Sequence, residues 1–272
     1  MSGNIFYRLD PLLICLVLIG VLVAASEIGF WLKKGRVKDG SGIIEKTDIA
    51  LIIGAVLTLL ELLLGFTYAM SEGRFEARRQ LVIEEANAIG TTYLRAKALP
   101  EPRSSEIQKL LRQYTALRVE IGRMTDVTPE KIGEVDNRTK QLHSLIWSHA
   151  AALARENPTP VISVFLQSLN EMIDLHAKRL AAFRNRVPLS IYLVLFVISV
   201  ITLWLTGYYF GARGQRVRTL TTVLALLVAS VMWLIMDLDQ PMRGAIRTSQ
   251  QSLFDLHQDL GETSRDGAEK VH

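Results

Sequence analysis

A glutamate lies in the middle of an apolar run that is long enough to cross a membrane. Glu61 is the only charged residue within residues 49–70. At 100° per residue it shares one helical face with small or polar residues, namely Gly54, Thr58, Gly65, Tyr68 and Glu72. An ionised carboxylate is costly in hydrocarbon, so it should face protein or water. Either this stripe borders a hydrated pathway, or its glycines pack closely on another helix while Glu61 is protonated or hydrogen-bonded to another span.

Two aspartates directly follow the last apolar run. Asp237 and Asp239, in the sequence MDLDQPMRG, are two residues apart and precede a proline turn. Carboxylate oxygens suit a hard cation such as Ca²⁺, but two acids are too few, so another segment would have to supply further ligands. The alternative is that these carboxylates pair with Arg243 or with an arginine of the helix that continues the second apolar run.

Polar side chains between the second and third apolar runs predict a buried network. Asn87 has apolar neighbours in EEANAIGTTYLRA, and Asn170 and Asp174 lie one helical turn apart in LNEMIDLHAKRLAAFRNR. Buried polar groups need hydrogen-bond partners, and a satisfied network can specify how helices pack. We therefore expect Asn87, Asn170 and Asp174 to form a structural polar network that sets the register of a helical bundle.

The elements that position these residues are helices. Apolar runs occur at residues 11–32, 49–70, 188–210 and 219–236. Each has about the 20 residues that a helix needs to cross hydrocarbon. The sequence between them is rich in Arg and Glu and has apolar residues at helical spacing. The pattern predicts an all-α integral membrane protein with four transmembrane helices in two hairpins and an inserted antiparallel helical bundle.

The second span is expected to continue as a long stalk helix, because no proline occurs from Thr47 to Leu99. Thr128 followed by Pro129 predicts a helix start, and the sequence ENPTP predicts a break near Asn157. Four regions follow: a first transmembrane hairpin (1–70), a water-exposed helical bundle (71–187), a second transmembrane hairpin (188–236), and an acidic turn with a short amphipathic helix and a flexible tail (237–272).

The charge pattern bears on orientation. The chain has 272 residues and a formal net charge of +4. The two short loops between the predicted spans carry a cluster of basic residues, namely Lys33, Lys34, Arg36, Lys38, Lys46, Arg213, Arg216 and Arg218. The positive-inside rule places such loops in the cytoplasm, with both termini and the bundle on the other side of a bacterial inner membrane.

Several function classes are not expected from the sequence. The histidines lack metal-binding spacing, and neither a phosphate-binding loop nor a nucleophile elbow occurs, so we expect neither an enzyme nor a cofactor beyond the Ca²⁺ hypothesis. No basic patch with interleaved aromatic residues points to nucleic acid. Cys15 is the only cysteine, which excludes an intrachain disulfide and a cysteine-based metal cluster.

The order of these parts resembles that of bestrophins, as does the segment LGFTYAMSEGRF at residues 64–75. Bestrophins carry Leu-Gly-Phe and, eight residues later, an arginine and an aromatic residue, which match Leu64, Gly65, Phe66, Arg74 and Phe75. In that family the second span lines a pentameric ion pore with an apolar neck. The resemblance places Phe66, Leu62 and Thr58 at three neck positions, although Leu62 and Thr58 differ in residue type from the family pattern.

A resemblance over nearly the whole chain is to the bacterial bestrophin-like proteins, formerly a domain of unknown function. It is carried by FEARRQLVIEEANAIGTTYLRA, LNEMIDLHAKRLAAFRNRVP and DLDQPMRG. DLDQP also resembles the calcium-binding turn after the fourth bestrophin span, although only two acids remain, and the N-terminal arginine-tryptophan signature of bestrophins is missing. The resemblance implies a homo-oligomer, a pentamer, that sits in a lipid bilayer and conducts small ions. It also implies a cytosolic bundle, the opposite of what the charge pattern favours.

The leading hypothesis is a homo-oligomeric ion channel or channel-like pore lined by the second transmembrane helix. The candidate pore-lining or gate residues are Thr58, Glu61, Leu62, Gly65 and Phe66. The alternative is a non-conducting membrane scaffold or sensor whose helical bundle binds a partner. A proton-coupled transporter that uses Glu61 is less favoured, because no repeated broken helix is visible in the sequence.

Overall fold

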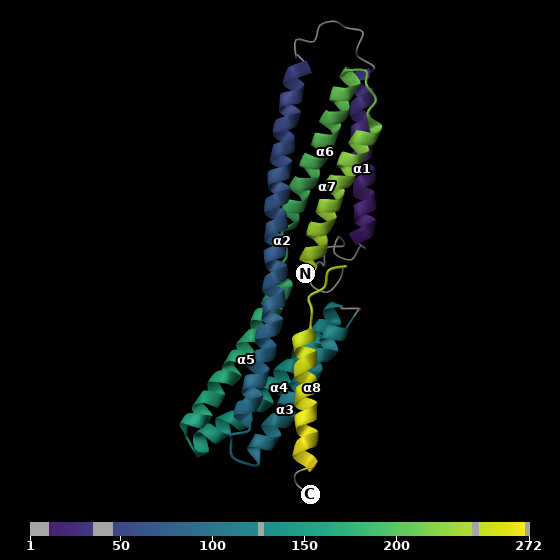
Figure 1. Ribbon diagram of the computed structural model, residues 1–272. Helices are drawn as coiled ribbons and strands as arrows, with labels where there is room; N and C mark the ends of the chain where they lie inside the picture. Colours follow the sequence, from purple (N-terminus) through teal and green to yellow (C-terminus); the bar gives the residue numbers. More distant parts are fainter. Residues whose placement is uncertain (1–10, 35–45, 125–127, 241–244, 270–272) are drawn as a thin grey trace. The chain divides into compact units, whose positions relative to one another are not determined.

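The computed structural model describes residues 11–34, 46–124, 128–240 and 245–269 (Figure 1). These ranges contain eight helices: α1 (Pro11–Lys34), α2 (Lys46–Ala96), α3 (Arg103–Arg123), α4 (Pro129–Glu156), α5 (Pro160–Arg184), α6 (Leu189–Ala212), α7 (Arg218–Asp239) and α8 (Gln251–Glu269). They contain no strand, which confirms the all-α prediction. The four helices that are long and apolar enough to cross a membrane are α1, α2, α6 and α7.

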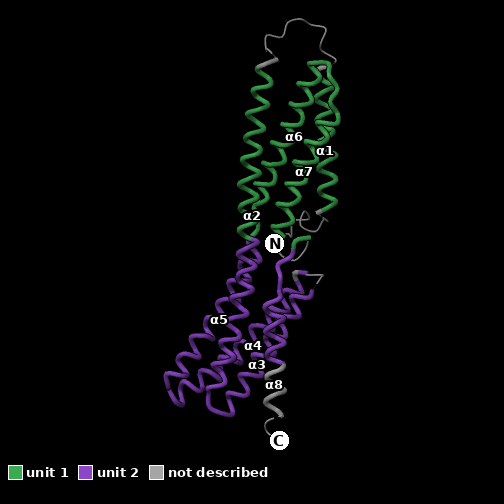
Figure 2. The backbone as a smooth tube through the Cα atoms, in the orientation of Figure 1, with its two compact units in different colours: residues 1–74, 186–240, 244–246 green, residues 75–185, 241–243, 247–272 purple. Residues whose placement is uncertain are grey.

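The chain divides into two compact units (Figure 2). Unit 1 comprises residues 1–74, 186–240 and 244–246, and unit 2 comprises residues 75–185, 241–243 and 247–272. Each unit has its own hydrophobic core. Helix α2 contributes to both, because its first part belongs to unit 1 and its last part, from Phe75, belongs to unit 2.

In unit 1, glycines let α1 and α6 approach until their backbones touch. A Cβ atom at Gly207 would lie 1.9 Å from the carbonyl oxygen of Ser26, and one at Gly29 would lie 2.2 Å from that of Trp204. Small residues allow this close contact between membrane helices. Larger apolar side chains from α1, α2, α6 and α7 fill the rest of the core, including Leu22, Leu60, Leu195, Leu203 and Ile235.

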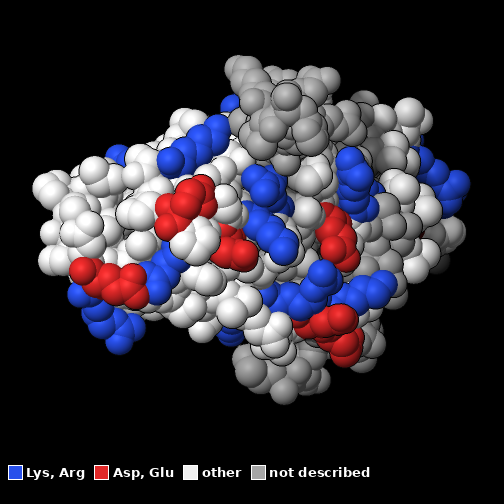
Figure 3. All heavy atoms as spheres, turned by 90° about the horizontal axis from the view of Figure 1, so that it is seen from below, with Lys and Arg blue, Asp and Glu red and all other residues white. Residues whose placement is uncertain are grey.

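Unit 2 is a helical bundle with an aromatic and aliphatic core. Side chains from α2, α3, α4 and α5 are fully buried in it, among them Ile89, Leu111, Ile146, Phe165 and Leu169. Helix α8 also packs on this core, because Leu253 is fully buried. The described surface that Figure 3 shows carries basic and acidic side chains interspersed with one another, as is typical of a hydrated protein surface.

Helix α2 is a single element of 51 residues, which confirms the predicted continuation of the second span. At about 1.5 Å per residue it is roughly 75 Å long, more than twice the hydrocarbon thickness of about 30 Å. In unit 1 it buries one narrow face, formed by Ile53, Leu60, Leu64, Thr67 and Ser71. The rest of its circumference there is largely exposed in the single chain.

Helix starts in the bundle follow the predicted capping rule, but the end of the chain does not follow its prediction. The side chain of Thr128 accepts a hydrogen bond from the amide of Lys131, and that of Thr159 accepts one from Ile162, each before a proline. The flexible tail, expected from about Gly261, was wrong up to Glu269, because α8 continues to that residue.

We expect Gly207→Ala to destabilise unit 1. The new methyl group would meet the Ser26 carbonyl at 1.9 Å, so the two helix backbones must separate, at a cost of about 1–3 kcal/mol. The measurement is the melting temperature of the detergent-solubilised protein. Gly20→Ala on α1 is the matched control, because nothing lies within 4 Å of its Cβ position. Equal melting temperatures for the two variants would contradict the close packing of α1 and α6.

Candidate functional site

The polar stripe of α2 lies on the surface of the chain. All six of its members are exposed: Gly54, Thr58, Glu61, Gly65, Tyr68 and Glu72. A Cβ atom at Gly54 or Gly65 would have nothing within 4 Å. Within the described chain, the glycines therefore do not pack closely on another helix. The interpretation of the stripe as a close helix contact does not hold inside a single chain.

The apolar members of the candidate pore site share this exposure. Leu62 is 52% exposed and Phe66 is 66% exposed in the single chain. The neighbouring Thr58 hydroxyl donates a hydrogen bond to the carbonyl of Gly54 at 3.0 Å, so its polarity is satisfied within the helix. All five predicted residues thus lie off the face by which α2 packs on its own chain.

Asp237 and Asp239 are both buried at the end of α7, where each accepts backbone hydrogen bonds. The Asp237 carboxylate accepts the amides of Ala245 at 2.9 Å and Ile246 at 2.8 Å. The Asp239 carboxylate accepts the amide of Val187 at 3.0 Å and lies 3.9 Å from Arg74. The alternative prediction, pairing with an arginine of the stalk, is therefore confirmed for Asp239.

These contacts bear on the Ca²⁺ hypothesis, which stays a prediction. The two carboxylates bind different segments, since Asp237 holds the chain after α7 and Asp239 holds the chain before α6. Among the described residues, no group of three or more His, Cys, Asp or Glu side chains is placed to hold a metal ion. Arg243, the other predicted partner, lies outside the described residues.

The predicted polar network of the bundle has other members. Asn87, Asn170 and Asp174 are all exposed in the chain, so placing them in a network buried within the bundle was wrong. Their helices turn other faces inward, with Ala86 and Ile89 buried on α2 and Leu169 and Met172 buried on α5. A polar network does exist in the core of unit 2, but its centre is Glu85.

Glu85 is fully buried and surrounded by donors from two helices. The Tyr114 hydroxyl donates to Glu85 Oε1 at 2.6 Å, and Arg118 Nη2 donates to Oε2 at 3.2 Å. Arg179 from α5 donates to the same Oε2 through Nη1. The His176 ring lies beside this cluster, with Nδ1 4.0 Å from Glu85 Oε1 and Nε2 3.4 Å from the Asp136 carboxylate.

The electrostatics of the network follow from this arrangement. Burial alone would raise the pKa of Glu85, but the charges of Arg118 and Arg179 and the hydrogen bond from Tyr114 lower this pKa to about 2. Burial and the nearby charge of His176 lower the pKa of His143 to about 4. The cluster therefore stays ionised at Glu85 and neutral at His143 over the physiological range.

A periodicity signal could have identified Glu85. It shares a helical face with Val82, Ala86 and Ile89, all of which are buried. Asn87 follows Glu85 by two residues and therefore lies on the other side of the helix. Apolar neighbours along the chain, such as those of Asn87, do not indicate that a helical residue is buried. Burial is indicated when apolar residues recur at spacings of three and four from the polar one.

Comparison with solved structures identifies the fold. Two crystal structures of a bacterial bestrophin homolog from Klebsiella pneumoniae match with TM-scores of 0.65 and 0.67, the second being a variant with a single substitution. Their identities are 15% and 16%, and the matches cover 90% and 92% of this chain and 96% and 98% of theirs. No curated protein matches the chain. The fold is therefore that of a bacterial bestrophin homolog.

The family follows from the sequence itself. Residues 20–253, most of the chain, match the bestrophin-like domain. The chain belongs to the bestrophin-like family, as the resemblance in its second span and bundle predicted.

We expect acid to unfold the wild-type protein more steeply than the Glu85→Gln variant. Because the pKa of Glu85 is about 2 in the folded state and 4.5 without the fold, its ionisation contributes stability above pH 4.5. That contribution, about 3 kcal/mol, is lost as the pH falls from 4.5 toward 2. The measurement is the melting temperature in detergent as a function of pH.

At neutral pH the same variant should be destabilised by about 3–5 kcal/mol, because two buried arginines lose their counter-charge. Glu84→Gln, one residue earlier and partly exposed, is the matched control and should keep the wild-type pH profile. An unchanged acid transition in Glu85→Gln would contradict the role of Glu85.

Proposed function

We propose that this protein assembles with copies of itself into an ion channel whose pore is lined by α2. The observation that supports the proposal most directly is the exposed carboxylate of Glu61 within an apolar, membrane-length segment. In a monomer embedded in lipid, this side chain would face hydrocarbon at a cost of several kcal/mol. In a ring of subunits with α2 nearest the axis, it would face water.

The distribution of residues around α2 is consistent with such a ring. One face packs on the chain through Leu60 and Leu64, and the face with Gly54, Glu61 and Gly65 is left open. The open face includes glycines, which allow the helix backbones of several subunits to approach a common axis. Five copies are what the resemblance to bestrophins implies, and a bacterial inner membrane is the location that it suggests.

Leu62 and Phe66 would form the gate. Both are largely exposed, and rings of such side chains around a narrow axis exclude water and block ions by dewetting. Glu61 lies one residue before Leu62, so a ring of carboxylates would border this constriction. A ring of acids attracts cations, and we therefore propose that the pore favours cations over anions.

We expect purified protein in liposomes to conduct ions, and Glu61→Gln to lower the cation-to-anion permeability ratio by on the order of tenfold, because the ring loses its negative charge. The measurement is the reversal potential in a salt gradient. Glu27→Gln is the control, because Arg218 already binds the Glu27 carboxylate through Nε at 2.8 Å and Nη2 at 3.1 Å. Absence of flux at every voltage, pH and calcium concentration would favour the non-conducting scaffold or sensor instead.

A second prediction concerns assembly. In a chain in which Cys15 is replaced by alanine, Phe66→Cys should form disulfide-linked dimers in oxidised membranes, because copies of one residue come within bonding distance only near a symmetry axis. Val194→Cys on α6 is the control. Val194 is 50% exposed, so a cysteine there is also accessible to the oxidant, but this variant should stay monomeric on a denaturing gel. Cross-linking through Val194 and not through Phe66 would place a helix other than α2 at the axis.

A further inference from the structure

A pair of buried histidines, which the proposed pore does not use, lies where α4 packs on its neighbours in unit 2. His143 of α4 is 7% exposed and His176 of α5 is 8% exposed. The two rings meet edge to face with their centroids 5.4 Å apart. The His143 ring also meets the Tyr114 ring of α3, at 4.9 Å between centroids. His143 is therefore a point at which α4 contacts both α3 and α5.

Each ring has a buried nitrogen without a hydrogen-bond partner among the described residues. These atoms are Nε2 of His143 and Nδ1 of His176. The other nitrogen of His176 is bonded, because Nε2 lies 3.4 Å from the Asp136 carboxylate. Packing of aromatic rings, more than hydrogen bonding, thus holds the His143 side chain where it is.

The charged groups around the pair include more cations than acids. They come from every helix packed against it, namely Glu85 of α2, Arg118 of α3, Asp136 and Lys140 of α4, and Arg179 of α5. Arg118 and Arg179 both pair with Glu85, and Lys140 Nζ lies 2.7 Å from the Asp136 carboxylate. A proton on His143 would therefore add a buried positive charge to a cluster whose acids are already paired.

Between pH 7 and pH 5 the histidines are the members of this cluster that can change charge. The pKa of Glu85 is about 2, so this acid stays ionised. Burial raises the pKa of Asp136, but hydrogen bonds from Lys140 and His176 lower it below its usual value. Burial lowers the pKa of His176, and that of His143 is about 4. A histidine released into water has a pKa of about 6.5 and takes up a proton more readily.

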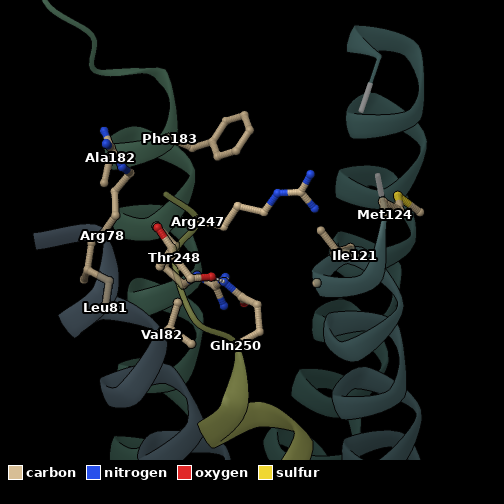
Figure 4. A pocket seen from close by; sticks show the side chains of 12 residues that line it. Arg78, Leu81, Val82, Ile121, Met124, Ala182, Phe183, Arg247, Thr248 and Gln250 are labelled. Atoms are coloured by element: carbon tan, nitrogen blue, oxygen red, sulfur yellow. Dashed lines mark hydrogen bonds between the residues drawn. The ribbon is translucent and has the colours of Figure 1, made fainter. Parts of the chain in front are cut away.

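Water can reach the edge of this contact through a cavity. The cavity has a volume of about 80 Å³, lies between α3, α4 and α5, and is bordered by Asp136 and His176. Since about 10–15 Å³ of such space holds one water molecule, it has room for several. Ile121, Met124 and Phe183 also line a neighbouring cavity, and Figure 4 shows Phe183 on one side of that cavity and Ile121 and Met124 on the other. A proton therefore has a hydrated route to the pair while unit 2 stays folded.

We propose that His143 is an acid-sensitive contact, whose neutral ring holds α4 against α3 and α5 and whose protonated ring releases α4. At neutral pH the ring packs on Tyr114 and His176. In acid the new charge lies in a cluster rich in cations, and it gains hydration when α4 moves away. The contact keeps its full stability above pH 6.5 and loses it as the pH falls from 6.5 toward 4, because the released form binds the proton more tightly.

The test is hydrogen exchange of the full chain in nanodiscs at pH 7 and pH 5, with each rate corrected for the intrinsic rate at that pH to give a protection factor. In wild-type protein the protection of the α4 amides should fall by about tenfold or more, because protonation of His143 favours the released form. The amides of α6 in unit 1 are the internal reference and should keep their protection.

Two variants identify the group that takes up the proton. His143→Phe should abolish the fall, because phenylalanine keeps a ring against Tyr114 and His176 but cannot be protonated. His149→Gln, a change of a half-buried histidine on the same helix, is the matched control and should show the wild-type fall.

The proposal is overturned if α4 of the wild-type protein is equally protected at both pH values, a result that does not depend on the folding of any variant. It is also overturned if His143→Phe loses protection in acid as much as His149→Gln does. Glu85 stays ionised at both pH values, so its own acid transition does not contribute. Neither result depends on whether the protein conducts ions.

Discussion

A carboxylate without access to water stays ionised only when positive groups replace its hydration, and Glu85 satisfies this constraint in unit 2. The side chain is on α2, and its partners Arg118 and Arg179 are on α3 and α5. Moving either guanidinium away would cost the buried Glu85 carboxylate a charged hydrogen bond that water cannot replace, so the three helices must keep one register. Purely apolar contacts, such as those of Ile89 and Phe165, would tolerate sliding more easily. The network therefore selects one packing of a core that hydrophobic burial holds together.

The same helix carries a second carboxylate whose environment is the opposite. Glu61 is exposed and lies within an apolar segment of the chain, whereas Glu85 is buried and bonded. The carboxylate of Glu85 thus has its hydrogen-bond partners inside a single chain, whereas that of Glu61 is exposed at the surface of the chain. Since both belong to one continuous helix of 51 residues, the difference does not come from helix formation. It comes from the surroundings, and the proposed assembly would supply the surroundings that Glu61 lacks in a single chain.

Much of the fold could be predicted from the sequence, because hydrophobic runs of membrane length and proline positions are local signals. The helix starts at Pro129 and Pro160 and the unbroken α2 follow from such signals. The members of the buried network could not be predicted in the same way. The spacing of apolar residues on α2 favours Glu85 over Asn87 as the inward side chain, but the partners Tyr114 and Arg179 are 29 and 94 residues away in sequence, and no local signal joins them to it. Glu61 could be singled out because a charge within an apolar run is itself a local anomaly, whereas Leu62 and Phe66 became candidates through the resemblance to bestrophins.

Arg179 connects the buried network to the chain that enters α8. Its guanidinium binds Glu85 along one edge and Gln250, just before α8, along the other. A lysine would donate to both partners from a single nitrogen, whereas the planar guanidinium of Arg179 binds them through two separate nitrogens. Gly122 allows Gln250 to come this close, since a Cβ atom there would lie 3.0 Å from the Gln250 side chain. The position of the chain entering α8 thus depends on the same buried carboxylate that sets the register of the bundle.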